Sequence, residues 1–138
     1  MQMSVPQQID LLDTIALMSV SKIHKELRIG DIDRLLAAPI MLNQYRIWRE
    51  GSRPVAYASW GYLSDEARER HLARAGLVRA RDWDSGAELW FMDFIAPFGN
   101  VIKYVRDLHC QFPDHKVAFI SRSYGTGKVQ RLGSYRNV

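Results

Sequence analysis

One carboxylate, Asp93, lies in the middle of the most apolar stretch of the sequence, Leu89–Gly99. An ionised carboxylate is rarely buried without a partner, because desolvation disfavours its charged form. Asp93 is therefore predicted to be one of two things. It is either a structural residue paired with an arginine or with backbone N–H groups, or an active-site carboxylate held by a rigid strand. The residues alone leave both alternatives open.

Four histidines are further candidates for a functional role. His71 is expected on an arginine-rich surface helix, His109 at the end of a helix and His115 in a turn, and all three are expected to be structural or simply exposed. His24 follows a predicted helix in a segment without a clear period, which is the usual setting of functional groups. It is the candidate general base, and the alternative is a histidine that is merely exposed.

Other reactive groups do not form a recognisable site. No histidine or cysteine pair has the spacing of metal ligands, so no metal is expected. Gly125–Lys128 resembles a phosphate loop only in part, because it lacks the earlier glycine and the Ser or Thr after the lysine. Cys110, the single cysteine, is expected in the core. A lone cysteine forms no intramolecular disulfide and fits a reducing cytoplasm.

The stretch that carries Asp93 predicts a buried central strand, because it is aromatic-rich and bounded by Ser85-Gly86 and Pro97. Strict alternation divides its side chains between two faces. One face takes Leu89, Phe91, Asp93 and Ile95, and the other takes Trp90, Met92 and Phe94.

The segments before this strand predict helices and a hairpin. A helix over Gln7–Met18 presents Ile9, Leu12, Ile15 and Ala16 at helical spacing. Asp31 caps a short helix through Leu36 that Pro39 closes. Asn43–Glu50 and Val55–Trp60 predict a β-hairpin, whose loop Arg53-Pro54 lengthens. Ser64 starts the next helix and Gly76 ends it.

The segments after it predict a helix over Val101–Cys110, opened by Gly99-Asn100, and strands at Lys116–Arg122 and Lys128–Leu132. Together the elements predict an α+β (mixed α/β) fold with a single central, mostly antiparallel sheet flanked by helices. The length of 138 residues fits one domain, 1–138.

A net charge of +4 and a pI near 9.4 favour an acidic partner, which could be nucleic acid, anionic lipid or an acidic carrier protein. Nucleic-acid binding through Tyr45, Trp48 and Tyr57 is disfavoured, because the arginines are scattered and these aromatics alternate as strand cores do. No apolar run approaches the roughly 18 residues of a membrane span, and the N-terminus shows no secretory signal. A cytoplasmic protein without an integral membrane segment is expected.

Five blocks of the sequence resemble, in order, the toxin-activating lysine acyltransferases that accompany RTX protoxins. The blocks are Asn43-Gln44-Tyr45, Pro54–Trp60, Leu63-Ser64, Asp82–Gly86 and Trp90–Gly99. The resemblance implies a variant of the GNAT fold. It also implies a fatty acyl transfer from acyl carrier protein, as a thioester co-substrate with no permanently bound cofactor, to internal lysines of an RTX-type protoxin. A homodimer is one alternative for the oligomeric state.

The resemblance also assigns roles. Ser21-Lys22-Ile23-His24 matches the Ser-x-x-His segment of the family, and Asp93 matches its essential aspartate. We therefore predict that His24 and Asp93 lie within hydrogen-bond reach, roughly 2.6–3.2 Å. A His24 base would accept a proton from the lysine amine, while Asp93 fixes its tautomer. Ser21 is expected beside it as an acyl-binding residue, and an acyl-enzyme on Ser21 or His24 is a less economical alternative.

Two further elements of the site are expected from the chemistry. The turn Phe98-Gly99-Asn100, which opens a helix, offers N–H donors to an oxyanion. An acyl chain needs an apolar slot, for which the candidate walls are Trp60, Trp90, Phe94 and Phe98, each of which would serve equally as plain core. The alternative functions are a CoA-dependent GNAT-type acetyltransferase, a non-catalytic basic domain that binds nucleic acid or protein, and an inactive scaffold.

Overall fold

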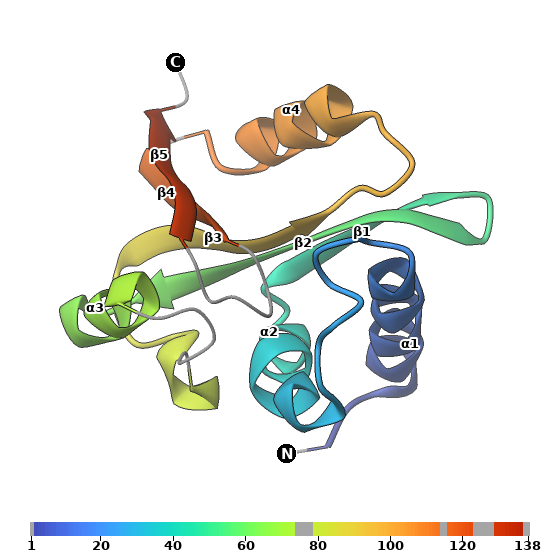
Figure 1. Cartoon of the computed structure of the whole chain (residues 1–138), viewed down its shortest axis with the longest axis horizontal. Helices are drawn as coiled ribbons and strands as arrows, with labels where there is room; N and C mark the ends of the chain where they lie inside the picture. The colour runs from blue at the N-terminus through green and yellow to red at the C-terminus, as the bar shows by residue number, and fades with distance from the viewer. Residues whose placement is uncertain (1, 74–78, 114–115, 123–128, 137–138) are drawn as a thin grey trace.

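Over the described residues, five strands form one mixed sheet in the order β1-β2-β3-β4-β5 (Figure 1). The computed structural model describes residues 2–73, 79–113, 116–122 and 129–136, the last two ranges by their backbone alone. Neighbouring strands are antiparallel except for β3 and β4, which are parallel. The predicted α+β fold with a mostly antiparallel sheet is therefore confirmed. The strands are β1 (Tyr45–Glu50), β2 (Arg53–Leu63), β3 (Glu88–Ile95), β4 (Lys116–Arg122) and β5 (Val129–Arg136).

Helices cover both faces of this sheet. Figure 1 shows α1 and α2 against one face of β1 and β2, α4 against the other face, and α3 beside one end of β2 and β3. No helix within the described residues is long and apolar enough to cross a membrane. The helices are α1 (Val5–Ser19), η1 (Ile29–Asp31), η2 (Asp33–Ala37), α2 (Ala38–Met41), α3 (Asp65–Ala73), η3 (Ala80–Asp82) and α4 (Val101–Gln111).

The inner face of α1 differs from the predicted one. Ile9 and Leu12 are 52% and 66% exposed, whereas Leu17 is buried. The reason is electrostatic: Arg49 on β1 donates to Asp10 at 2.6 Å and to Asp13 at 2.7 Å. These half-buried charge-assisted bonds turn the acidic side of the helix toward the sheet and leave the Ile9 and Leu12 side outside.

The second helical segment is longer than predicted. Asp31 ends the short turn η1, and the π-helix η2 leads directly into α2. Pro39 does not close the helix, because it lies in the first turn of α2, where a missing N–H costs no hydrogen bond. The predicted stop at Pro39 is therefore wrong.

The β1–β2 hairpin is tighter than predicted. Glu50 pairs with Arg53, so that Arg53 and Pro54 belong to β2 and the loop is Gly51-Ser52. Gly51 has φ of +60°, the left-handed conformation that tight hairpin turns require. Later elements follow the prediction more closely: Ser64 Oγ accepts from Ala67 N at the start of α3, and β4 has the predicted bounds. The predicted helix end at Gly76 lies outside the described residues.

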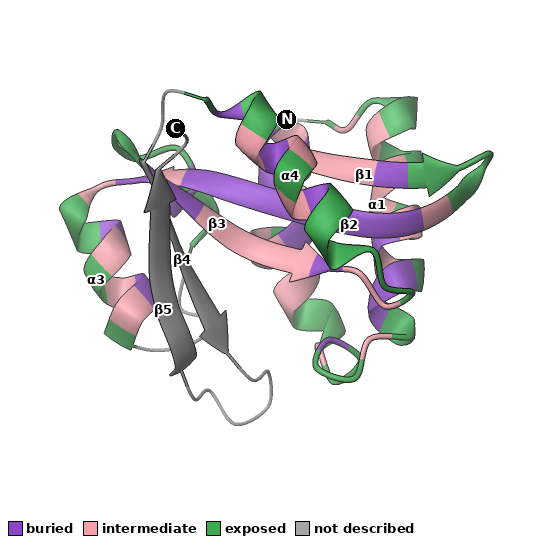
Figure 2. Cartoon of the chain, turned by 90° about the horizontal axis from the view of Figure 1, so that it is seen from above, coloured by how far each residue is buried: buried purple, intermediate pink, exposed green. Residues whose placement is uncertain are grey.

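The core has one layer on each face of the sheet. On the α4 side, Trp48, Trp60 and Leu89 pack with Tyr104 and Leu108 of the helix. On the α1 side, the packed and buried residues are Leu17, Met18, Leu36, Tyr57 and Ile95. Figure 2 shows β2 buried along most of its length, as expected of a strand covered on both faces. β2 and β3 are therefore a rigid platform for any side chain that they carry.

A close backbone contact at Gly86 holds the start of β3 against the end of β2. A Cβ at this position would lie 2.5 Å from Leu63 O and from Ser64 N. Because backbone atoms cannot move aside cheaply, we expect Gly86→Ala to lower the free energy of unfolding by about 2–4 kcal/mol. Urea denaturation measures this loss. Gly30→Ala is the control, since a Cβ there meets nothing within 4 Å, and equal midpoints for both variants would contradict the prediction.

Candidate active site

A β-bulge sets the direction of the Asp93 side chain. Ser59 on β2 pairs with Asp93, but the next residue, Trp60, pairs with Phe91, so Met92 is an extra residue in β3. One extra residue exchanges the faces of all the side chains before it. The predicted strict alternation is wrong for this reason. Leu89, Phe91 and Phe94 pack on the α4 side, Ile95 packs on the α1 side, and Trp90 and Met92 pack near α3.

His24 lies in a tight turn that follows α1. Lys25 N and His24 N both donate to Ser21 O, at 3.0 and 3.2 Å, and Leu27 N donates to His24 O. Residues three apart in such a turn have side chains on the same side. The turn itself therefore brings the Ser21 and His24 side chains together, without any contact with the sheet being needed.

Ser21, His24 and Asp93 form a hydrogen-bonded line. His24 Nε2 lies 2.7 Å from Asp93 Oδ1, across 69 residues of sequence, and His24 Nδ1 lies 2.6 Å from Ser21 Oγ. Asp93 Oδ1 also accepts from Phe94 N at 2.9 Å. The predicted contact between His24 and Asp93 is confirmed. Only 1% of the His24 side chain and 11% of the Asp93 side chain are exposed, so water screens this pair weakly.

The two contacts fix the chemistry of the imidazole. An ionised carboxylate only accepts hydrogen bonds. In a neutral His24 the ring proton is therefore on Nε2, which donates a hydrogen bond to Asp93. Nδ1 is then the basic nitrogen, and it accepts from the Ser21 hydroxyl. A serine, a histidine and a carboxylate bonded in this order are the arrangement of acyl-transfer enzymes on several unrelated folds. The geometry is therefore suited to taking a proton at Ser21.

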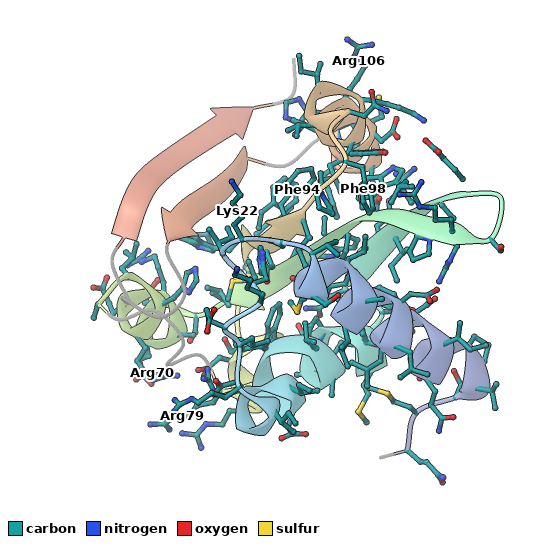
Figure 3. The ribbon with its side chains drawn as sticks, turned by 45° about the vertical axis from the view of Figure 1, so that its right-hand side comes forward. Lys22, Arg70, Arg79, Phe94, Phe98 and Arg106 are labelled. Atoms are coloured by element: carbon teal, nitrogen blue, oxygen red, sulfur yellow. The ribbon has the colours of Figure 1, made fainter. Side chains whose placement is uncertain are left out.

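The candidate oxyanion turn lies where α4 begins. Gly99 and Asn100 have φ of +91° and +63°, and Gly99 N donates to Ala96 O within the turn. Phe98 is 51% exposed, and the Arg53 guanidinium lies 4.3 Å from its ring centre. Figure 3 shows Phe94 and Phe98 near α4. The role of this turn in binding an oxyanion stays a prediction.

The candidate walls of the acyl slot are divided between clusters. Trp60 and Phe94 belong to the cluster under α4, where the Trp60 and Phe112 rings meet edge to face at 4.9 Å. Trp90 packs with Leu63 and Ala67 beside α3. The structure thus brings Trp60 and Phe94 together, places Trp90 in another cluster and leaves Phe98 exposed near α4.

Several buried polar residues were not apparent in the sequence. His71, expected on a surface helix, is 2% exposed and meets the Trp90 ring edge to face. Tyr57 and Ser59, on β2, are fully buried beside Asp93. Burial first, and the charge of Asp93 second, raises the pKa of the Tyr57 phenol above its usual range. Alternation on β2 could have revealed the two hydroxyls, since Tyr57 and Ser59 share a face.

The prediction for Cys110 has a clear outcome. Cys110 is exposed near the end of α4, so its predicted place in the core is wrong. The helix turns Tyr104 and Leu108 inward, and position 110 falls on the opposite side. Across the described part of the chain, no three His, Cys, Asp or Glu side chains gather as metal ligands would. Gly125–Lys128 and His115 lie outside the described residues.

The surface around His24 is basic. Lys22, Lys25 and Arg28 are exposed on the same segment, and the buried imidazole lies between the two lysines in sequence. Arg28 also pairs with Asp31 at 3.5 Å. Figure 3 shows the Lys22 side chain extending from this segment on the side away from α2. Glu26 is also exposed on this segment, which therefore carries three basic side chains and one acidic one.

The sequence is similar to those of known proteins. The chain matches the HlyC RTX toxin acyltransferase family over residues 7–136. It is 33% identical over 116 residues to the protein-lysine myristoyltransferase HlyC of Escherichia coli, a match that covers 81% of this chain and 66% of that protein, just under two thirds.

Two further relatives are similar. The RTX-I toxin-activating lysine-acyltransferase ApxIC of Actinobacillus pleuropneumoniae is 29% identical over 122 residues, covering 80% of this chain and 70% of the relative. An uncharacterised protein of Synechocystis is 28% identical over 126 residues, covering 89% and 86%. Ser21, His24 and Asp93 all lie inside the region that the family matches. The chain belongs to the HlyC family of RTX toxin acyltransferases.

Proposed function

We propose that this chain transfers a fatty acyl group from acyl carrier protein to a lysine side chain of an RTX-type protoxin. The observation that carries the proposal is the line Ser21–His24–Asp93, with contacts of 2.6 and 2.7 Å. It unites a turn after α1 with the central strand, and it lies in a chain that belongs to a family of acyltransferases.

The first requirement of this reaction is a base. A lysine amine has a pKa near 10.4, so its deprotonation at neutral pH costs about 4–5 kcal/mol. Solvent takes this first proton before the attack; Nδ1 of His24 accepts the second proton, which the nitrogen loses as the amide forms, and Asp93 stabilises the imidazolium through Nε2–H. Because the His24 side chain is nearly inaccessible, we expect the proton to pass through the half-buried Ser21 hydroxyl.

The bonds change as follows. The amine nitrogen attacks the thioester carbonyl carbon, and the C–N bond forms as the carbonyl becomes an oxyanion. The amine proton moves to Ser21 Oγ while the Ser21 proton moves to His24 Nδ1. The C–S bond then breaks, and the proton held by His24 neutralises the departing thiolate. The products are an amide on lysine and a free thiol, and no oxidant or metal is needed.

The sheet supports a GNAT-like assignment and a place for the thioester arm. β3 and β4 are parallel, connected through α4, and paired only at Trp90 with Ala118 and at Phe91 with Phe119. Strands that separate beyond a short pairing leave backbone N–H and C=O groups that the amides of a bound arm can pair with. Asp93 follows the last pair by two residues, so an arm bound there would bring its thioester close to the base.

Charge supports a carrier protein as the donor. The chain carries +4, and Lys22, Lys25 and Arg28 are exposed on the segment that holds Ser21 and His24. An acidic carrier would be attracted to this surface over a distance of about one Debye length. Phe94 follows Asp93 directly in β3, so their side chains project from opposite faces of the sheet, and the cluster containing Trp60 and Phe94 lies on the face away from Asp93.

The experiment that tests this function mixes the purified chain with an RTX-type protoxin and a series of acyl carrier protein thioesters from acetyl to palmitoyl. Peptide mass spectrometry is expected to find an acyl-lysine whose mass follows the donor. Matched acyl-CoA thioesters form the second arm. Transfer from CoA thioesters alone would show that acyl carrier protein is not the donor. If no donor gave an acyl-lysine, the chain would be an inactive scaffold and not an enzyme.

A further inference from the structure

Two buried hydroxyl groups next to Asp93 have no ordinary hydrogen bond. Tyr57 and Ser59 are both 0% exposed, and neither Tyr57 Oη nor Ser59 Oγ meets a partner of acceptable geometry among the described residues. A buried hydroxyl without a partner costs about 1–3 kcal/mol. A sequence that only had to fill this space would gain stability from Phe and Ala, so the two hydroxyls require an explanation.

Their position suggests one. Ser59 is the direct partner of Asp93 across the β2–β3 pair, and side chains opposite one another in this way have Cβ atoms roughly 4.5–5.5 Å apart. Tyr57 lies two residues before Ser59, on the same face of β2. Rotation about χ1 of Ser59 can therefore turn its Oγ toward the carboxylate.

The electrostatics of Tyr57 point the same way. The negative charge of Asp93 raises the pKa of the Tyr57 phenol, so the two groups are close enough to interact. The Ser59 hydroxyl lowers the same pKa, although the two hydroxyls form no hydrogen bond of normal geometry. Burial outweighs this effect, and the phenol keeps its proton as a donor. Tyr45 on β1 also raises the pKa of Tyr57. The pKa of Tyr45 is in turn raised by burial and by Asp10, which accepts its hydrogen bond, and lowered by Arg49.

We propose that Tyr57 and Ser59 are positioning residues, whose hydroxyls donate to the Asp93 carboxylate and hold it ionised and aligned with His24. This inference rests on the function proposed above, and it adds a second layer behind the Ser21–His24–Asp93 line. A carboxylate offers about four acceptor positions, so these donors add to the bonds from His24 and Phe94. The two buried hydroxyls then serve to preorganise the carboxylate.

The test follows the protonation of His24 directly and so does not depend on any acyl substrate. Long-range ¹H–¹⁵N NMR spectra record the ring nitrogens of His24 across a pH titration, in the wild type, Tyr57→Phe and Ser59→Ala. A hydroxyl that donates to Asp93 stabilises the negative charge of its carboxylate. Both hydroxyls therefore favour the deprotonated state of the His24–Asp93 pair. Their removal is expected to move the titration midpoint upward by roughly half a pH unit or more in each variant.

Tyr45→Phe is the matched control. Tyr45 packs in the same cluster as Tyr57, but its hydroxyl donates to Asp10 and not to Asp93. Its titration midpoint is expected to stay within about 0.2 units of the wild type, since no charge-assisted bond to Asp93 is lost. Thermal unfolding adds a second readout: Tyr57→Phe, which removes a donor from the buried carboxylate, should unfold at a lower temperature than the wild type. An unmoved midpoint in either Tyr57→Phe or Ser59→Ala, or an equal shift in Tyr45→Phe, would overturn the proposal. An inactive protein with shifted midpoints would overturn only the proposed function.

Discussion

His24→Gln is expected to lower the rate of lysine acylation by roughly 10²–10⁴-fold, the usual contribution of a general base. Glutamine has no nitrogen that accepts a proton near neutral pH, whereas its amide N–H still reaches toward Asp93. The substitution therefore removes the base and keeps a donor for the carboxylate. The measurement is the initial rate of acyl-lysine formation by mass spectrometry at saturating donor.

Glutamine is a better probe than alanine because His24 is not a simple loop histidine. Its ring is 2% exposed and bonded at both nitrogens, so His24→Ala would leave a cavity and deprive Asp93 of a partner. We expect that variant to lose about 2–4 kcal/mol of unfolding free energy, which would confuse instability with lost chemistry.

A control with equal burial separates the two effects. His71 is also 2% exposed, but it lies on α3 against the Trp90 ring. His71→Gln should cost stability and leave the acylation rate per folded molecule within about threefold. If His24→Gln retained a rate similar to that of His71→Gln, His24 would not be the base, and Asp93, water or the substrate would have to take the proton.

The elements of the fold were largely predictable because each has a local cause. Serine at 64 caps a helix, two left-handed residues open α4, and β-branched or aromatic runs define the strands. What failed depends on contacts between distant segments. The Arg49 pairs with Asp10 and Asp13 rotate α1, and no periodicity within Gln7–Met18 contains that information.

The bulge in β3 is the clearest case of such a limit. Period-2 alternation gave the faces of Leu89–Ile95 on the assumption of a regular ladder, and one extra residue at Met92 reverses part of that assignment. The site was predictable in another way. Asp93 and His24 stood out because each was a polar group without an evident local role, and the resemblance to a family paired them. The hydroxyls of Tyr57 and Ser59 escaped notice because tyrosine and serine are ordinary strand residues until their burial is known.

The role of Ser21 divides two mechanisms, and we expect it to relay a proton without carrying the acyl group. Its hydroxyl lies 2.6 Å from His24 Nδ1, which would equally activate it as a nucleophile. An amine attacks a thioester directly, however, so an acyl-serine adds a step without removing a barrier. Ser21→Ala is expected to reduce the acylation rate by roughly 10²-fold, because water can replace a relay only imperfectly. Ser19→Ala is the control, since that exposed hydroxyl donates to Ala16 O at 2.7 Å, away from the imidazole.

Intact mass spectrometry after rapid acid quench distinguishes the two mechanisms in a single turnover. With a relay, the chain never gains the mass of the acyl group while the lysine of the target is modified. With a nucleophile, an acyl-enzyme appears and decays at the rate at which acyl-lysine forms, and hydroxylamine removes it. Ser21→Ala is the control, because it offers no hydroxyl to acylate at position 21. An acyl group on Ser21 that forms as fast as the lysine product, and that is missing from Ser21→Ala, would exclude the relay. Its absence from the wild type would leave Ser21 as the proton carrier between substrate and His24.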